Sequence, residues 1–234
     1  MIIPPGLNRI LLPCVIPTPA QCFSVSYKGL QLEELVSFQN CLPKALDKAI
    51  DKRKIDFITG RLCVAQALSA LDPKRVWPPV TMGLDRLPLW PEGIVGSITH
   101  TEGFTSACVA LATDFDSVGI DAEKIMPLAQ AEKIRKAISF ESEIKLMQSD
   151  GFELAAALSL IFSAKESLFK CLYPLVQINF GFLDAELSSL DTGKEIFSIQ
   201  LLRELSGKFG KGTTISGNFT MSESLVLTGV YLKN

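Results

Sequence analysis

The fold is decided by residues 153–172, ELAAALSLIFSAKESLFKCL, in which nearly every side chain from Leu154 to Phe162 is apolar. A run of this kind predicts a long buried helix. It is followed by Tyr173-Pro174, and because the residue before a proline disfavours the α region, we expect the helix to end there. Its apolar stretch is interrupted by serines and is too short to cross a bilayer, so we expect no membrane span.

Short segments with alternating or apolar character flank this helix. Downstream, they are separated by turn residues, which predicts an antiparallel meander. Upstream, they predict strands, and the proline at position 127 opens a short helical stretch. The expected meander strands are residues 183–190, 196–202, 213–221 and 225–232, the upstream strands are 94–98, 104–112 and 117–123, and the short helix is 127–138.

A second helical block lies earlier in the chain. Apolar side chains recur there at three- and four-residue steps from residue 43 to residue 71, and Asp72-Pro73 ends the run. A proline-rich extended arm, residues 1–20, and a short strand, residues 22–27, precede the block, and a loop, residues 77–96, follows it. Because strands, a long helix and strands occur twice, we expect an α+β fold with two similar halves, residues 1–116 and 117–234.

Composition and charge exclude several classes of protein. The chain has 234 residues, of which 47% are hydrophobic and 21% charged, so disordered, collagen-like and coiled-coil proteins are excluded. Its net charge of −2 gives no overall attraction for nucleic acid, and we expect no nucleic-acid partner. The 6 cysteines stand singly and only 1 histidine accompanies them, which argues against a zinc site and predicts reduced thiols in a cytoplasmic protein.

Three short segments place polar side chains where a core would take apolar ones. The first is residues 96–101, GSITHT, which closes an apolar strand with Ser97, Thr99 and the single histidine, His100. A histidine in this position is either a structural or surface residue or a contact to a ligand.

The second segment is residues 118–123, VGIDAE, a predicted strand. Side chains two apart on a strand point the same way, so Asp121 and Glu123 share a face. Like charges so close repel each other, unless the face is solvated or a hard cation lies between them. Mg²⁺ takes oxygen ligands of this kind, whereas the alternative is a polar strand end without a ligand.

The third segment is residues 162–170, FSAKESLFK, within the long apolar helix. Helical spacing places Phe162, Lys165, Glu166 and Phe169 on one side, and Lys170 one turn beyond Glu166. An exposed ion pair between Glu166 and Lys170 is one explanation. The other is that these charges lie in a buried helix and need partners or ligands.

In this order and spacing, the segments GSITHT, VGIDAE and FSAKESLFK resemble the 4'-phosphopantetheinyl transferase superfamily, in its two-halved, single-chain type. Residues 88–95, PLWPEGIV, and Arg53 ahead of the Gly60-Arg61 pair resemble its enterobactin-synthetase branch. The resemblance covers about residues 50–175 and implies two α+β halves with pseudo-twofold symmetry, each a small antiparallel sheet packed with a long helix. The first half would hold the adenosine end of coenzyme A, and the second the metal and catalytic residues.

The activity that the resemblance implies is transfer of the 4'-phosphopantetheine group of coenzyme A to a serine of an apo carrier protein. The reaction would need Mg²⁺ and release 3',5'-adenosine bisphosphate, in siderophore or other non-ribosomal peptide or polyketide synthesis. Asp121, Glu123 and Glu166 would hold the metal, with Glu166 also the general base, and Lys165 and Lys170 would face the pyrophosphate.

The resemblance also implies the contacts to coenzyme A. Arg53 and Arg61 match positions that hold the adenosine 3'-phosphate end, and His100, flanked by Ser97 and Thr99, would contact a phosphate. Arg86 is either a further contact or a solvated arginine of its loop.

Carrier proteins are acidic around the modified serine, so their docking surface here should be basic with an apolar patch. The segment Lys124 to Lys136, with Ile134 and Met126, is the candidate, although it also fits an ordinary amphipathic helix. We expect a monomer, because one chain contains both halves. The alternative function is a non-catalytic module that binds coenzyme A or a nucleotide, but without a metal three carboxylates would repel a pyrophosphate.

Overall fold

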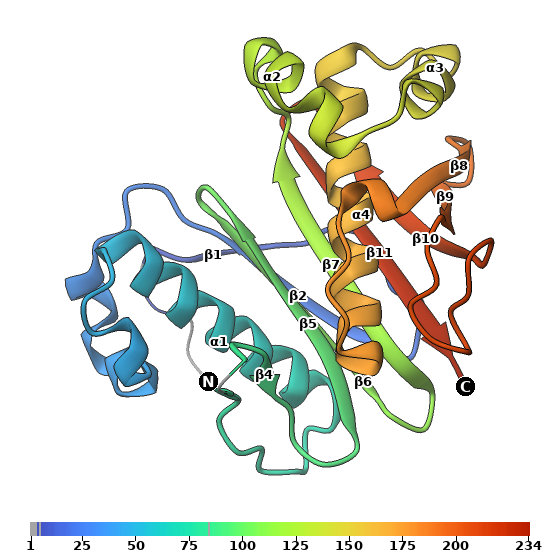
Figure 1. Ribbon diagram of the computed structural model, residues 1–234. Coiled ribbons are helices and arrows are strands. Elements are labelled where there is room, and N and C mark those ends of the chain that lie inside the picture. The colour runs from blue at the N-terminus through green and yellow to red at the C-terminus, as the bar shows by residue number, and fades with distance from the viewer. Residues whose placement is uncertain (1–3, 5, 84) are drawn as a thin grey trace. The chain divides into compact units, whose positions relative to one another are not determined.

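The computed structural model describes residues 4, 6–83 and 85–234, and the chain divides into two compact units (Figure 1). Unit 1 comprises Met1–Asp116 and Asn234, and unit 2 comprises Ser117–Lys233. Each unit combines an antiparallel sheet with one long helix, which confirms the predicted α+β class. Residues 1–3 and 5 of the predicted N-terminal arm, and Leu84 of the predicted loop, lie outside the described residues.

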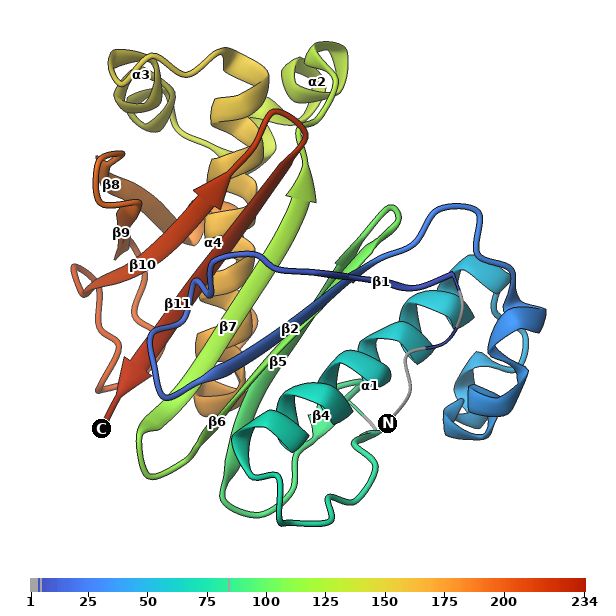
Figure 2. The same ribbon diagram turned by 180° about the vertical axis from the view of Figure 1, so that it is seen from behind.

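In unit 1, helix α1 (Asp51–Leu71) lies against a sheet with strand order β1-β2-β6-β5 (Figure 2). Neighbouring strands of this sheet are antiparallel. The strands are β1 (Asn8–Ile10), β2 (Gln21–Ser26), β5 (Ile94–Thr101) and β6 (Phe104–Leu111), and a separate pair is formed by β3 (Thr81–Met82) and β4 (Pro88–Leu89). Two 3-10 segments, η1 (Leu32–Cys41) and η2 (Lys44–Leu46), precede α1, so only part of the predicted helical block is α-helical.

Apolar side chains from both layers form the core of unit 1. Ile58, Cys63 and Ala67 of α1 are fully buried, and so are Ala107 and Val109 of β6. Burial of such side chains is the main favourable contribution to folding.

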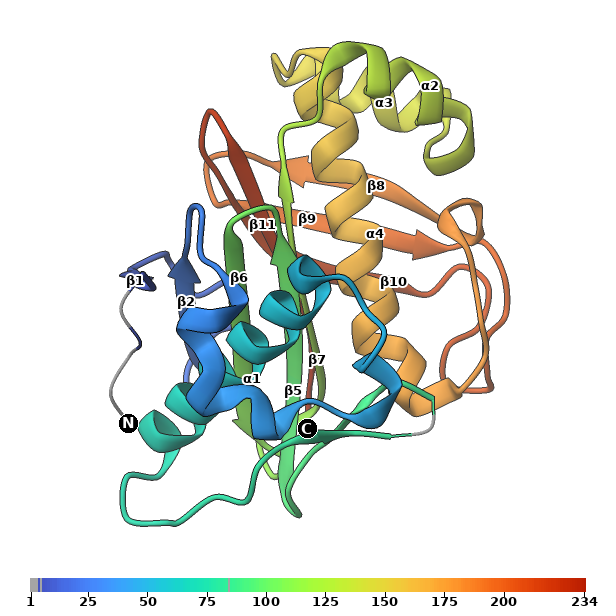
Figure 3. The ribbon, with the colours of Figure 1, turned by 90° about the vertical axis from the view of Figure 1, so that its left-hand side faces the viewer.

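In unit 2, helix α4 (Leu154–Val176) packs against a sheet with strand order β7-β11-β10-β9-β8 (Figure 3). The meander from β8 to β11 is antiparallel, as predicted. Helices α2 (Leu128–Ile138) and α3 (Glu141–Ser149) pack against α4, and η3 (Phe182–Asp184) leads into the meander. The strands are β7 (Phe115–Lys124), β8 (Ala185–Asp191), β9 (Ile196–Leu201), β10 (Thr214–Met221) and β11 (Leu225–Lys233). None of the helices in the described parts of the chain has the length and apolar character that a membrane crossing requires.

The close approach of α4 to β7 depends on Gly119. A Cβ at this position would lie 2.1 Å from the carbonyl oxygen of Ser167 and 2.5 Å from the backbone nitrogen of Cys171. Because backbone atoms cannot yield like a flexible side chain, only glycine allows the helix to come this close. Ser117 adds a hydrogen bond from its Oγ to the carbonyl oxygen of Cys171, at 2.6 Å.

Two helix predictions were incomplete. α4 continues past the predicted end at Tyr173 and includes Pro174, ending where Gln177 adopts a left-handed backbone conformation, φ 52°. Pro174 has no N–H to donate to the carbonyl oxygen of Lys170, so the helix loses one hydrogen bond of its ladder shortly before its last residue, Val176. Helix α3 was not predicted, and its Ile144 and Met147 face the core.

The prediction that all cysteines are reduced was wrong for one pair. Cys14 and Cys22 form a disulfide, with Cα atoms 6.0 Å apart, because the segment between β1 and β2 turns back beside β2. This distance is within the ordinary reach of a disulfide. The cysteines Cys41, Cys63, Cys108 and Cys171 are free thiols.

Candidate functional site

An acidic cluster lies where β7 and α4 of unit 2 meet. Asp121 and Glu123 lie two apart on β7, with Ala122 fully buried between them, and Glu166 comes from α4. Asp121 is buried, while Glu123 and Glu166 are half-buried. The alternation of β7 and the contact of α4 at Gly119 therefore bring the three predicted metal ligands into one region.

Lys170 is the cation that belongs to this cluster. Its Nζ lies 2.6 Å from Oδ1 of Asp121, and its side chain is 28% exposed. The ion pair observed for Lys170 is therefore made to Asp121 across the helix–strand contact, not to Glu166 along the helix.

Burial and neighbouring carboxylates raise the pKa values of Glu123 and Glu166. Burial raises the pKa of Glu123 to about 7, the charge of Asp121 and that of Glu166 act in the same direction, and Lys170 opposes them. Burial and then Asp121 also raise the pKa of Glu166, again opposed by Lys170. Three carboxylates with one ammonium group leave an excess of negative charge, which a bound cation would compensate.

The donor set fits a hard divalent cation in type and charge, because Mg²⁺ takes carboxylate oxygens. The acids are not gathered as tightly as bound ligands. Among the described residues, three metal-binding atoms within 4.8 Å of one another are found at Cys14, Cys22 and Cys108, not at the three acids. Convergence of Asp121, Glu123 and Glu166 on one ion therefore requires a change of side-chain rotamers and remains a prediction.

The expectation that Lys165 faces a pyrophosphate is not met. Its Nζ is buried and donates to Oε2 of Glu143 at 2.8 Å and to the carbonyl oxygens of Ile138 at 3.0 Å and Phe182 at 2.9 Å. An ammonium group has three protons, and these three acceptors use all of them. Glu143 belongs to α3, which was not predicted, so the partner of Lys165 could not be recognised from the helix that carries it.

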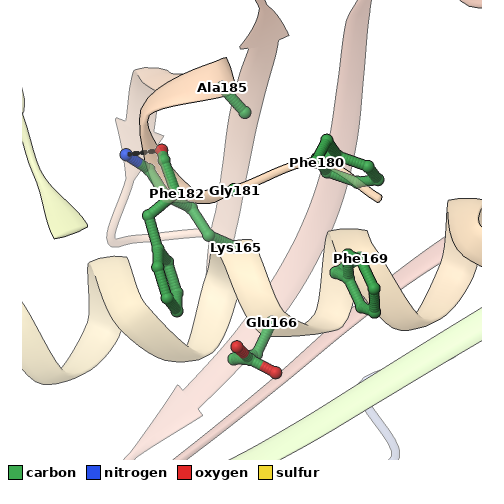
Figure 4. Close-up of a pocket in the computed structure, with 7 residues that line it drawn as sticks. All are labelled: Lys165, Glu166, Phe169, Phe180, Gly181, Phe182 and Ala185. Atoms are coloured by element: carbon green, nitrogen blue, oxygen red, sulfur yellow. Dashed lines mark hydrogen bonds between the residues drawn. The ribbon is translucent and has the colours of Figure 1, made fainter. Parts of the chain in front are cut away.

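A pocket beside Glu166 was missed by the sequence analysis. It is shallow, with a cavity volume of about 40 Å³, opens to solvent, and is lined by the residues in Figure 4, Lys165, Glu166, Phe169, Phe180, Gly181, Phe182 and Ala185. The rings of Phe169 and Phe180 lie 5.2 Å apart, and Phe182 stacks on Phe162 at 5.0 Å. Sites for small ligands have this combination of apolar walls and a few polar groups.

A basic cluster lies in unit 1, between α1 and β5. Nη1 of Arg53 lies 2.9 Å from Nε2 of His100, so the structure brings these two predicted phosphate contacts together. Arg61 lies on α1 about two turns after Arg53, and its guanidinium group stacks over the ring of Phe57 at 4.2 Å. Burial lowers the pKa of Arg61 to about 10, Cys41 opposes this effect, and the charge of Arg53 adds to it.

Asp56 lies beneath this basic cluster and was also missed. Its carboxylate is buried, with Oδ1 accepting a hydrogen bond from the hydroxyl of Tyr27 at 2.7 Å and Oδ2 lying 3.6 Å from Nδ1 of His100. In the sequence, Asp56 stands in a run of charged residues at the start of a helix, which gives no sign that it is buried.

Three other residues predicted to contact coenzyme A, Ser97, Thr99 and Arg86, gain less support from the structure. Ser97 and Thr99 are buried, 5% and 1% exposed, so the structure gives no support for their contact with a ligand. Arg86 is exposed in the loop between β3 and β4, with φ 67°, and its role remains a prediction.

In the proposed docking segment, Lys124 to Lys136, lysines are exposed as a basic surface requires, but one of the two expected apolar side chains is not. Lys124, Lys133 and Lys136 are exposed. Met126, however, is buried and packs in the core, and the exposed apolar side chain is Leu128 at 54%.

Comparison with known proteins gives two family matches. The 4'-phosphopantetheinyl transferase N-terminal domain matches residues 42–110, and the 4'-phosphopantetheinyl transferase superfamily matches residues 117–220. The chain is 36% identical over 192 residues to 4'-phosphopantetheinyl transferase Svp of Streptomyces mobaraensis, covering 78% of this chain and 74% of that protein. It is 32% identical over 195 residues to 4'-phosphopantetheinyl transferase Npt of Nocardia iowensis, with 78% and 84% covered. It is also 33% identical over 175 residues to enterobactin synthase component D of Salmonella typhimurium, with 75% and 70% covered.

Proposed function

The chain belongs to the 4'-phosphopantetheinyl transferase superfamily, and we propose that it transfers the 4'-phosphopantetheine group of coenzyme A to a serine of an apo carrier protein, releasing 3',5'-adenosine bisphosphate. The observation that carries this proposal is the acidic cluster of Asp121, Glu123 and Glu166, whose three carboxylates outnumber the ammonium group of Lys170 that pairs with Asp121. Such a cluster repels a diphosphate unless a cation is bound.

Mg²⁺ is the cation that we assign to this cluster, held by Asp121, Glu123 and Glu166 with oxygens of the diphosphate. When bound, it would neutralise charge on the phosphoryl group that is attacked.

The chain's own residues have distinct roles in this proposal. Glu166 accepts the proton of the carrier serine, because burial and Asp121 raise its pKa toward the range in which a carboxylate is a useful base. Lys170 is partly exposed and offers its ammonium group to the 5'-phosphate of the leaving 3',5'-adenosine bisphosphate. Lys165 has no such role, because its protons are used within the fold.

Coenzyme A combines charged phosphates with a less polar pantetheine arm. Arg53, Arg61 and His100 of unit 1 bind its phosphates, since guanidinium groups match phosphate oxygens in geometry and charge. In unit 2, the rings of Phe169, Phe180 and Phe182 offer an apolar surface beside Glu166 to the pantetheine arm.

The carrier would dock on the exposed lysines of the segment Lys124 to Lys136, with Leu128 as the apolar contact. The similarity to enterobactin synthase component D supports a role in siderophore synthesis. We further propose that the protein acts as a monomer in the cytoplasm, where both substrates are made.

The test is incubation of the protein with coenzyme A, Mg²⁺ and an apo carrier protein, followed by mass spectrometry of the carrier. We expect a mass gain of one phosphopantetheine, and no gain with Glu166→Gln. Glu204→Gln is the matched control, because Glu204 is an exposed carboxylate of unit 2, and it should retain full transfer. An unmodified carrier with the wild-type protein, across aryl, peptidyl and acyl carriers, would contradict the proposal.

A further inference from the structure

The buried carboxylate of Asp56 has no evident structural purpose at its position. It is 6% exposed, on the first turns of α1, and it lies below the only histidine of the chain. Burying a carboxylate is costly unless hydrogen bonds and opposite charge compensate it. The groups that compensate Asp56 are therefore informative about its use.

One oxygen of Asp56 is held by a fixed donor. The hydroxyl of Tyr27 donates to Oδ1 at 2.7 Å, and Thr105 lies 3.3 Å from the same hydroxyl and 3.0 Å from that of Thr59. Burial raises the pKa of Tyr27 to about 12, with Thr105 opposing and Asp56 adding to this effect, so the hydroxyl keeps its proton at neutral pH. Tyr27, which follows β2, is thus held by Thr105 of β6, which also contacts Thr59 of α1, and this network fixes the carboxylate of Asp56 in one orientation.

The other oxygen of Asp56 faces His100. Oδ2 lies 3.6 Å from Nδ1 of the imidazole, while Nε2 on the opposite side of the ring lies 2.9 Å from Nη1 of Arg53. A carboxylate at Nδ1 favours a proton on that nitrogen, and it stabilises the ring when Nε2 is protonated as well. An anion that enters between Nε2 and the guanidinium group would then receive hydrogen bonds from two cations.

We infer that Asp56, held by Tyr27, is a positioning residue that orients His100 and stabilises its charged form for a phosphate group of coenzyme A. The inference rests on the proposed function, in which Arg53 and His100 bind that phosphate. Asp56 itself does not touch the ligand, because His100 lies between them.

The test compares Asp56→Asn, which keeps the shape and removes the charge, with His100→Ala and with the double variant. Calorimetry measures the Kd of coenzyme A, and the transfer assay measures KM and kcat. We expect Asp56→Asn to raise Kd and KM about tenfold, with kcat nearly unchanged, because it removes the negative charge that lies 3.6 Å from Nδ1 of His100. In the His100→Ala background, the same substitution should have almost no further effect, since Asp56 acts through His100.

Asp51→Asn is the matched control, because Asp51 is an exposed carboxylate in the first turn of the same helix, and it should leave Kd unchanged. Thermal denaturation of each variant separates loss of folding from loss of binding. An unchanged Kd with folded Asp56→Asn would overturn the inference, and so would an equal loss in the His100→Ala background. Failure of the proposed function is distinguishable, because wild-type protein would then leave the carrier unmodified while the binding measurements still test Asp56.

Discussion

The two units place opposite charges on the same kind of scaffold. In unit 1, α1 and β5 bring Arg53 and His100 within 2.9 Å of each other above a single buried carboxylate, Asp56. In unit 2, α4 and β7 bring three carboxylates together with the ammonium group of Lys170. By charge, the first cluster favours an anion and the second a cation.

In both units a contact between a long helix and a sheet positions the charged side chains, and the sign of their charge determines which kind of ligand the cluster favours. Substitutions in unit 1 should therefore weaken binding of coenzyme A, whereas those in unit 2 should abolish the chemistry. Two of the four predictions compare the units directly, and the other two concern unit 2 alone.

The largest effect is expected for Asp121→Asn. Removing one ligand charge from the acidic cluster should lower kcat about a thousandfold, as losing a preorganised charge does in other active sites, with a small change in KM for coenzyme A. Arg53→Ala should do the reverse, raising KM about tenfold and changing kcat little. Steady-state kinetics with saturating apo carrier measure both, and equal effects of the two substitutions on both parameters would break the comparison.

The next largest effect concerns the buried pair of Lys165 and Glu143 in unit 2. Glu143→Ala should lower the free energy of unfolding by about 3–5 kcal/mol, because it leaves Lys165 buried and uncompensated. The pair of Asp191 and Lys194 is exposed to solvent, so Asp191→Ala should lower the free energy of unfolding far less. Urea denaturation measures the difference, and similar losses from both substitutions would show that Lys165 is not held as described.

Asp56, Lys165 and the aromatic pocket show what the sequence could not predict. The apolar periodicity of α1 and α4 and the alternation of β5 to β11 follow from spacing, so the fold class, the meander and the acidic pair of β7 were predictable. Spacing along α4 also placed Lys165 beside Glu166. The direction of the Lys165 ammonium group depends on Glu143, which lies 22 positions away on a helix with weak signals, and no local pattern reveals such a partner.

Local sequence patterns also could not predict the burial of Asp56 or the disulfide of the N-terminal arm. Tyr27, which directly follows β2, donates to Asp56, and Thr105 of β6 contacts the same hydroxyl, so the surroundings of Asp56 depend on residues distant in the chain. The Cys14–Cys22 disulfide likewise depends on how the arm is folded. Helix α4 includes Tyr173 and Pro174 although the residue before a proline disfavours the α region, so this local rule did not fix the end of the helix.

A smaller effect distinguishes the two helix–sheet contacts. Gly119→Ala should destabilise the protein by about 1–3 kcal/mol, because the new methyl group meets backbone atoms of Ser167 and Cys171. In unit 1, a Cβ at Gly60 would lie 3.1 Å from the side-chain Cγ2 of Ile98, which can shift. Alanine at Gly60 should therefore be nearly neutral or slightly stabilising within the helix. Thermal denaturation of both variants tests this, and a larger loss at Gly60 would contradict it.

The smallest effect is a pH dependence in the metal-free protein. The pKa of Glu123 is about 7 in the folded state, above its ordinary value of 4.5, so the folded state binds more protons between these values. Its contribution to stability is therefore present below about pH 4.5 and is lost as the pH rises to about 7. Urea titrations in the presence of chelator measure how the free energy of unfolding changes with pH. Glu123→Gln should reduce the slope of this dependence, while Glu204→Gln should leave it unchanged. A slope that survives in Glu123→Gln would mean that Glu123 does not carry the raised pKa.

The central claim is that the acids of unit 2 act through a divalent cation. The most direct measurement is the mass gain of the apo carrier as Mg²⁺ is titrated into chelated protein with coenzyme A present. We predict no transfer without the ion, recovery at added Mg²⁺ for the wild type, and transfer about a thousandfold slower than the wild type at every Mg²⁺ concentration for Asp121→Asn. Full transfer in excess chelator, or by Asp121→Asn, would contradict the claim.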